Sequence, residues 1–161
     1  MINGWLLVIA LVFSFALTGG VRHYAIVREV LDIPNARSSH SIPTPRGGGA
    51  AIVCTFLLAS GLACYLGSVT GPMFYGLLSA GSLVAIVGFL DDHGHIAALW
   101  RLLAHFAAAA IALFWLGGMP ELDFGLFRLN GFEVLTPLGL FYLVWMLNLY
   151  NFMDGIDGLA A

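Results

Sequence analysis

The chain has 161 residues, of which 60% are hydrophobic and 9% are charged, and its formal net charge at pH 7 is −3. Soluble domains usually carry about 25% charged residues, so the composition excludes a water-soluble fold of this length. A lipid bilayer can cover this much apolar surface, and we therefore expect an integral membrane protein.

Five apolar segments follow one another along the chain, at positions 2–20, 49–66, 72–90, 102–117 and 134–148. Each is close to the length of about 20 residues that spans a bilayer as a helix. No basic residue precedes the first segment and no clear cleavage site follows it, which favours an uncleaved span over a signal peptide. The sequence thus predicts an all-α fold: one membrane domain over residues 1–161, a polytopic bundle of five transmembrane helices.

The arginines are unevenly distributed between the connecting segments. Segment 21–48 contains four of the six, segment 91–101 contains Arg101, and segment 67–71 contains none. The positive-inside rule then places segments 21–48, 91–101 and 149–161 in the cytoplasm and the N-terminus outside. Every polar cluster therefore falls on one face of the membrane. No basic stripe suggests nucleic acid as a partner.

The first polar cluster is the stretch "DIPNARSSHSIPTPRGGG" at positions 32–49. Its prolines forbid a continuous helix, and its glycines allow the backbone to approach a ligand closely. Arg37, His40 and Arg46 can bind phosphate oxygens. The alternative is a solvated loop whose arginines only set the topology.

The second cluster is the pair Asp91 and Asp92, which follows the third apolar segment directly. Adjacent carboxylates repel each other, and a Mg²⁺ ion shared with substrate phosphates would relieve that repulsion. The alternative is a solvated pair at the start of a loop. His93 and His95 could extend the pair into a transition-metal site, or they could simply be polar loop residues.

The third cluster is the closing stretch "NLYNFMDGIDGLAA" at positions 148–161. Its glycines argue against an ideal helix and favour a helix end that opens into a polar pocket. Carboxylates are unfavourable at the negative end of a helix dipole, which indicates a functional reason for them. The alternative is an ordinary helix C-terminus with glycine stop signals. Amide or carboxylate groups recur at every third position: Asn148, Asn151, Asp154 and Asp157.

Together the three clusters predict a site for a metal-bound phosphate at the membrane surface. A transporter or channel usually places ionisable groups at mid-membrane depth, whereas here His105 is the nearest exception. A non-catalytic membrane anchor would not need carboxylates at the end of a span.

The stretches "GFLDD", "NLYNFMDGIDGLA" and "DIPNARSSHSIPTPRGGG" resemble the polyprenyl-phosphate N-acetylhexosamine-1-phosphate transferases. That superfamily includes the undecaprenyl-phosphate GlcNAc-1-phosphate transferase and the phospho-N-acetylmuramoyl-pentapeptide transferase. The first polar loop is most similar to the branch that initiates O-antigen and related glycan synthesis. Family members are considerably longer, so the resemblance implies an N-terminal part of such an enzyme, which we expect to be inactive alone.

The resemblance implies that sugar-1-phosphate is transferred from a UDP-N-acetylhexosamine to undecaprenyl phosphate in the bacterial inner membrane, with the active site on the cytoplasmic face. The product would start a lipid-linked cell-envelope glycan such as lipopolysaccharide. Mg²⁺, with Mn²⁺ as the alternative, would be the cofactor, bilayer lipid a further partner, and a homodimer is compatible with this interpretation. The sugar itself is not identified.

The resemblance also implies roles for individual residues. Whether an aspartate becomes phosphorylated or the lipid phosphate attacks directly stays open, although a phosphate already ionised at pH 7 favours direct attack. His93 and His95 lie outside the shared pattern. The implied catalytic residues are Asp91 and Asp92, the implied metal ligands are Asp91, Asp92 and Asp154, and the implied substrate-binding residues are Asn151, Asp154, Asp157, Arg37, His40 and Arg46.

Overall fold

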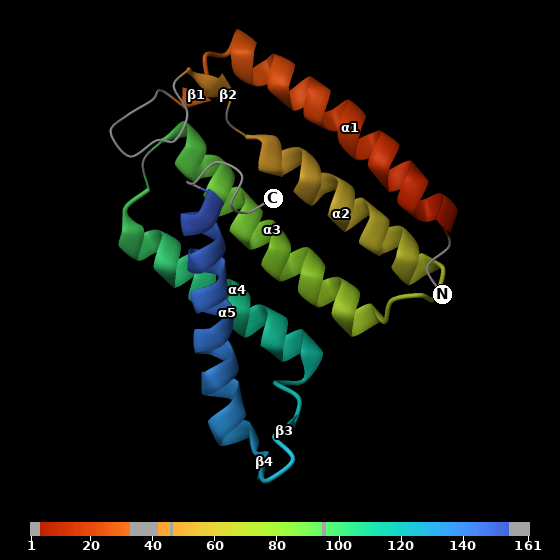
Figure 1. Cartoon of the computed structure of the whole chain (residues 1–161), viewed down its shortest axis with the longest axis vertical. Coiled ribbons are helices and arrows are strands. Elements are labelled where there is room, and N and C mark those ends of the chain that lie inside the picture. Colours follow the sequence, from red (N-terminus) through yellow and green to blue (C-terminus); the bar gives the residue numbers. More distant parts are fainter. Residues whose placement is uncertain (1–3, 33–41, 46, 95, 155–161) are drawn as a thin grey trace.

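A computed structural model describes residues 4–32, 42–45, 47–94 and 96–154 of the chain. Over these residues the fold consists of five long helices and two short antiparallel hairpins (Figure 1). The helices are α1 (Gly4–Val27), α2 (Gly48–Tyr65), α3 (Gly71–His93), α4 (Ala98–Leu116) and α5 (Phe132–Asp154), and the hairpins pair β1 (Leu31–Asp32) with β2 (Thr44–Pro45) and β3 (Leu122–Asp123) with β4 (Arg128–Leu129).

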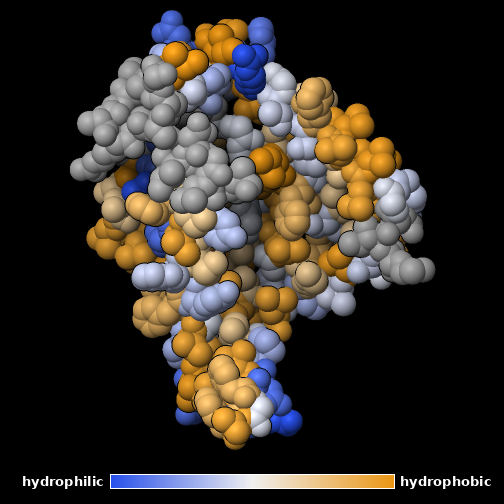
Figure 2. Space-filling view, viewed as in Figure 1, coloured by the Kyte–Doolittle hydropathy of each residue, from blue (hydrophilic) through white to orange (hydrophobic). Residues whose placement is uncertain are grey.

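All five helices are long and apolar enough to cross a membrane. Large apolar side chains point outward along them, as the orange surface in Figure 2 shows. Phe15 on α1, for example, is 83% exposed. Such a surface is stable only when lipid covers it, and helices satisfy their own backbone hydrogen bonds there. The prediction of an all-α polytopic membrane bundle is confirmed.

Three helices extend beyond the predicted apolar segments at their C-terminal ends. Helix α1 continues to Val27 instead of residue 20, α3 to His93 instead of residue 90, and α5 to Asp154 instead of residue 148. Hydropathy reports where the apolar environment ends, whereas the backbone hydrogen bonds continue until a residue breaks them. Asp91 and Asp92 therefore lie in the last turn of a helix, and the alternative in which they begin a loop is wrong.

The helices pack in sequence order through small residues, which let helix backbones approach closely inside a membrane. The largest interface joins α3 and α4, and Ala108 and Ala109 of α4 are buried in the bundle. A Cβ atom added to Gly76 of α3 would lie 3.3 Å from the Cβ of Trp115 of α4. Glycine at position 76 thus sets the distance between the two helices.

Successive helices run in opposite directions, so the C-terminal ends of α1, α3 and α5 share one end of the bundle with the N-terminal ends of α2 and α4 (Figure 1). The β1–β2 hairpin lies at this end, and the β3–β4 hairpin lies at the other end. The bundle therefore gathers the acidic pair and the polar end of α5 at one end, as the topology argument predicted. Which side of the membrane that end faces stays a prediction.

Candidate active site

The corner between α3 and α4 is held together by the carboxylate of Asp91. Its Oδ1 accepts a hydrogen bond from the backbone N–H of Ile96 at 3.0 Å, and its Oδ2 accepts one from Nη1 of Arg101 at 2.7 Å. The Asp91 side chain is 27% exposed and that of Arg101 is 37% exposed. A charge-assisted hydrogen bond of this length is among the stronger contacts in proteins. Asp91 thus fixes where α4 starts relative to the end of α3.

Asp92 is half-buried and lies one residue further along the same turn. Neighbouring residues on a helix are about 100° apart around the axis, so their side chains do not face each other. The two carboxylates therefore point in different directions. Asp91 faces the first turn of α4, whereas Asp92 points to another side of the α3 axis. The two carboxylates can therefore have different roles.

The side chain of His93 contacts a residue of its own helix, Phe89. Its Nδ1 lies 2.8 Å from the carbonyl oxygen of Phe89, and its ring packs on the Phe89 ring at a centroid distance of 4.2 Å. These contacts lie within one turn of α3 and do not depend on a ligand. His95 lies outside the described residues, so the transition-metal alternative for the two histidines is not tested.

A row of polar side chains continues from Arg101 towards α5. His105 follows Arg101 by four residues on α4, which places both on one face of the helix. Both Arg101 and Asn148 lie within electrostatic reach of the His105 ring. Asn148 also donates a hydrogen bond from Nδ2 to the carbonyl oxygen of Val144 at 2.8 Å. Arg101 and His105 of α4 and Asn148 of α5 therefore form a group of polar side chains next to the α3–α4 corner.

The Nδ1 atom of His105 is buried and has no hydrogen-bond partner among the residues that the structure describes. Buried polar atoms are nearly always paired in native proteins, with protein groups or with ordered water. In the sequence, Arg101 indicates only the topology and His105 is only an exception to the apolar spans. Their spacing of four residues is the signal that they share a helix face.

The remaining predicted site residues are described only in part. Asn151 is exposed in the last turns of α5. The backbone of Asp154 ends this helix, but its side chain is outside the described part of the structure. Arg37, His40, Arg46 and Asp157 lie outside it altogether. Over the described residues no three His, Cys, Asp or Glu side chains converge as a metal-binding group, and the predicted set of Asp91, Asp92 and Asp154 stays a prediction.

The chemistry of the visible donors nevertheless suits a divalent cation. Mg²⁺ prefers carboxylate oxygens and keeps several waters, and the C-terminal end of a helix carries partial negative charge. Asp92 lies at that end of α3, one residue from Asp91. Both oxygens of Asp91 accept hydrogen bonds that hold the α3–α4 corner, from Ile96 and Arg101. These contacts fit a positioning role for Asp91, with Asp92 beside it as a candidate ligand.

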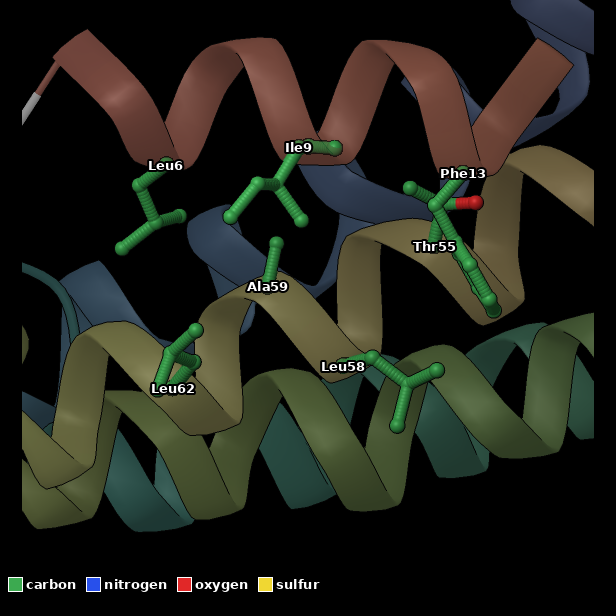
Figure 3. A pocket seen from close by; sticks show the side chains of 8 residues that line it. Leu6, Ile9, Phe13, Thr55, Leu58, Ala59 and Leu62 are labelled. Atoms are coloured by element: carbon green, nitrogen blue, oxygen red, sulfur yellow. The ribbon is translucent and has the colours of Figure 1, made fainter.

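A second candidate location is an apolar groove of about 190 Å³ between α1 and α2 (Figure 3). Leu6, Ile9 and Phe13 of α1 point from one side towards α2. The hydroxyl of Thr55 donates to the carbonyl oxygen of Ala51 at 2.8 Å, so this polar group is already occupied. The groove suits a hydrocarbon chain and offers nothing to bind a nucleotide or a diphosphate. It is lined by Leu6, Ile9, Ala10, Phe13, Thr55, Leu58, Ala59 and Leu62.

Comparison with known proteins covers the part of the chain that carries two of the three polar clusters. Residues 74–161 match the model of glycosyl transferase family 4. The match covers nearly all of α3, the whole of α4 and α5, and the residues after them. It therefore includes Asp91–Asp92 and the closing polar stretch.

Several curated proteins are similar over almost the whole chain. A decaprenyl-phosphate N-acetylglucosaminephosphotransferase of Mycobacterium leprae is 31% identical over 94% of this chain and 40% of its own length. Undecaprenyl-phosphate α-N-acetylglucosaminyl 1-phosphate transferases of Thermotoga maritima and Yersinia pestis are 28% and 30% identical, over 93% and 96% of this chain and 45% and 42% of their own lengths. The chain thus spans about two fifths of the length of these relatives. No solved structure matches it.

Proposed function

Because this chain belongs to glycosyl transferase family 4, the polyprenyl-phosphate N-acetylhexosamine-1-phosphate transferases, we propose that it serves the transfer of an N-acetylated sugar-1-phosphate from a UDP-sugar to undecaprenyl phosphate. The product would start a lipid-linked cell-envelope glycan, with O-antigen and lipopolysaccharide as the expected destination. We place the reaction at the cytoplasmic face of the bacterial inner membrane. The observation that carries the proposal is the family match over Asp91–Asp92 and the closing polar stretch. The described C-terminal end of α5 lies at the same end of the bundle as the acidic pair.

The proposed reaction forms one bond and breaks one. A non-bridging oxygen of the polyprenyl phosphate attacks the β-phosphorus of the UDP-sugar. The bond from that phosphorus to the oxygen shared with the α-phosphate breaks, and UMP leaves with the electron pair. Since a phosphate monoester is largely ionised at pH 7, this direct attack requires no base to remove a proton. Sugar-1-phosphate and lipid phosphate are then joined as a diphosphate.

The chain's own residues would bind and orient the reactants. We assign Asp92 and Asp154 to hold Mg²⁺, which when bound would neutralise charge on the diphosphate. We assign Asp91 to fix the α3–α4 corner through Ile96 and Arg101. Its carboxylate would thereby keep Asp92 in place beside the reacting phosphates.

The nucleotide and the anionic oxygens need further partners. Asn151 and Asp157 are proposed to bind the uridine nucleotide, because amide and carboxylate groups match the donors and acceptors of a base and a ribose. Arg37, His40 and Arg46 are proposed to bind phosphate oxygens, a task for which the arginine fork is well shaped. These assignments rest on the sequence and the family.

The test uses the native protein, expressed from its complete coding sequence and reconstituted in lipid nanodiscs. Undecaprenyl phosphate, Mg²⁺ and a panel of radiolabelled UDP-N-acetylhexosamines are supplied, and lipid-linked label and UMP are measured. We expect UMP and labelled lipid to form in equal amounts, with Asp92→Asn reducing the rate about a hundredfold or more. Asp123→Asn, at the other end of the bundle, is the matched control and should leave the rate unchanged. Transfer without any UMP would refute the proposal.

A further inference from the structure

The β3–β4 hairpin between α4 and α5 has an apolar tip on a charged base. Phe124, Leu126 and Phe127 form the tip, and Leu126 is 97% exposed. Figure 2 shows this tip as an orange patch bordered by blue at the end of the bundle away from the acidic pair. Exposed large apolar side chains that gather at one place usually mark an interaction surface.

The tip has a defined shape. The backbone N–H of Phe124 donates to the carbonyl oxygen of Phe127 at 3.0 Å, and the two rings stack at a centroid distance of 4.9 Å. Oδ1 of Asp123 accepts a hydrogen bond from the N–H of Gly125 at 2.8 Å. Gly125 has φ of +79°, which glycine adopts without strain. The tip therefore presents its apolar side chains without first having to become ordered.

The charges at the base are paired with one another. Nε of Arg128 lies 2.9 Å from Oδ2 of Asp123 and 3.9 Å from Oε1 of Glu121. All three side chains remain about half exposed to solvent or more. Paired charges of this kind can lie next to the headgroup layer of a membrane while the tip is inserted below it.

The hairpin is attached close to the membrane boundary. A Cβ atom added to Gly118 would lie 3.5 Å from the Phe132 ring, and one added to Gly139 would lie 2.8 Å from Sδ of Met119. The connection that leads from α4 into the hairpin therefore packs beside the N-terminal part of α5, which belongs to the span. From Leu122 to the tip the hairpin reaches at most about 14 Å. This distance is similar to the length of one helical turn added to the thickness of the polar layer of one leaflet.

We propose that this tip inserts into the headgroup–acyl boundary of the bilayer leaflet opposite the acidic end, and that it anchors α4 and α5 at that depth. Lipid is the favoured partner because the tip is continuous with side chains that already face lipid: Phe114 at the end of α4 is 79% exposed, and Phe132 at the start of α5 is 71% exposed. Aromatic residues are enriched at this depth of membrane proteins. The proposal requires only that the helices span a membrane and not that the chain is a transferase.

The test places a fluorescent label on the tip. Leu126→Cys is made together with Cys54→Ala and Cys64→Ala, labelled with an environment-sensitive dye, and reconstituted in nanodiscs of phosphatidylcholine and phosphatidylglycerol. Ser68→Cys, in the exposed connection between α2 and α3 at the same end, is the matched control. Quenching is measured with spin-labelled lipids and with aqueous iodide.

We expect the label at position 126 to be quenched by the lipid-borne spin label several-fold more strongly than the label at position 68, and to be shielded from iodide. Quenching by iodide with none by lipid would place the tip in water and overturn the proposal. Shielding from both quenchers, together with cross-links between copies through the cysteine introduced at position 126, would show a protein partner instead and would equally overturn it. Circular dichroism confirms that both variants keep their helices.

Discussion

The carboxylate of Asp91 and the guanidinium of Arg101 meet at 2.7 Å and join the last turn of α3 to the first turn of α4. Ten residues separate them in the chain, and the corner between them is further fixed by the N–H of Ile96. Helix α4 in turn packs on α5. The contact between Asp91 and Arg101 therefore helps to fix the position of the acidic pair relative to the C-terminal end of α5.

Removing Arg101 should loosen this corner without unfolding the protein. The pair is partly exposed, so we expect Arg101→Ala to lower the free energy of unfolding by only about 1 kcal/mol, as measured by thermal unfolding in detergent. In a double-mutant cycle, Asp91→Ala and Arg101→Ala should be non-additive by a similar amount. Full additivity would mean that the two side chains do not interact in the membrane-embedded protein.

The two carboxylates of the acidic pair should differ in their effects on activity. Asp92→Asn removes a proposed metal ligand, and we expect the turnover rate to fall about a hundredfold or more, with a higher Mg²⁺ concentration needed for half-maximal rate. Asp91→Asn keeps an oxygen that can accept from Ile96, so we expect a smaller loss and an unchanged Mg²⁺ requirement. Steady-state rates over a Mg²⁺ titration measure both. The reverse order of severity would exchange the two assignments.

The number and character of the helices could be predicted from the sequence because lipid imposes a strict minimum length and a strong apolar composition on each span. The helix ends could not, because hydropathy does not report backbone hydrogen bonding beyond the membrane boundary. Thus the third apolar segment ends at residue 90, whereas helix α3 continues through Asp91 and Asp92 to His93.

The candidate site was predictable in its location but not in its contacts. The alternation of spans was enough to bring the acidic pair and the end of α5 to one end of the bundle. The contact of Asp91 with Arg101 depends on the angle at which α4 leaves α3, which no local pattern encodes. The proximity of His105 to Asn148 depends in the same way on how α4 packs against α5.

The close packing of α3 on α4 should make Gly76 sensitive to substitution. A Cβ atom at this position lies 3.3 Å from Trp115, and any larger side chain must displace that residue. We expect Gly76→Leu to destabilise the bundle by about 1–3 kcal/mol. Gly88→Leu on the same helix is the matched control, because nothing lies within 4 Å of its Cβ position. Equal melting temperatures for the two variants would contradict this packing.

The orientation of the bundle can be tested by labelling single cysteines in intact cells. The positive-inside rule places positions 35–45 and the end of α3 in the cytoplasm. A membrane-impermeant maleimide should therefore label Ser68→Cys from outside and should label His93→Cys only after the cells are permeabilised, since both positions are exposed. Labelling of His93→Cys in intact cells would invert the topology and place the acidic end outside.

The interaction between His105 and Asn148 should contribute a measurable coupling energy between α4 and α5. Polar contacts between membrane helices contribute about 0.6 kcal/mol on average, so we expect a coupling of that size in a cycle of His105→Leu and Asn148→Leu. His105→Leu alone should cost little stability, because it also removes the buried Nδ1 that has no partner among the described residues. Asn148→Leu leaves the His105 ring in place without the amide that interacts with it from α5, and should cost more. If Asn148→Leu is the less harmful of the two, His105 is paired elsewhere and the row from Arg101 to α5 is not continuous.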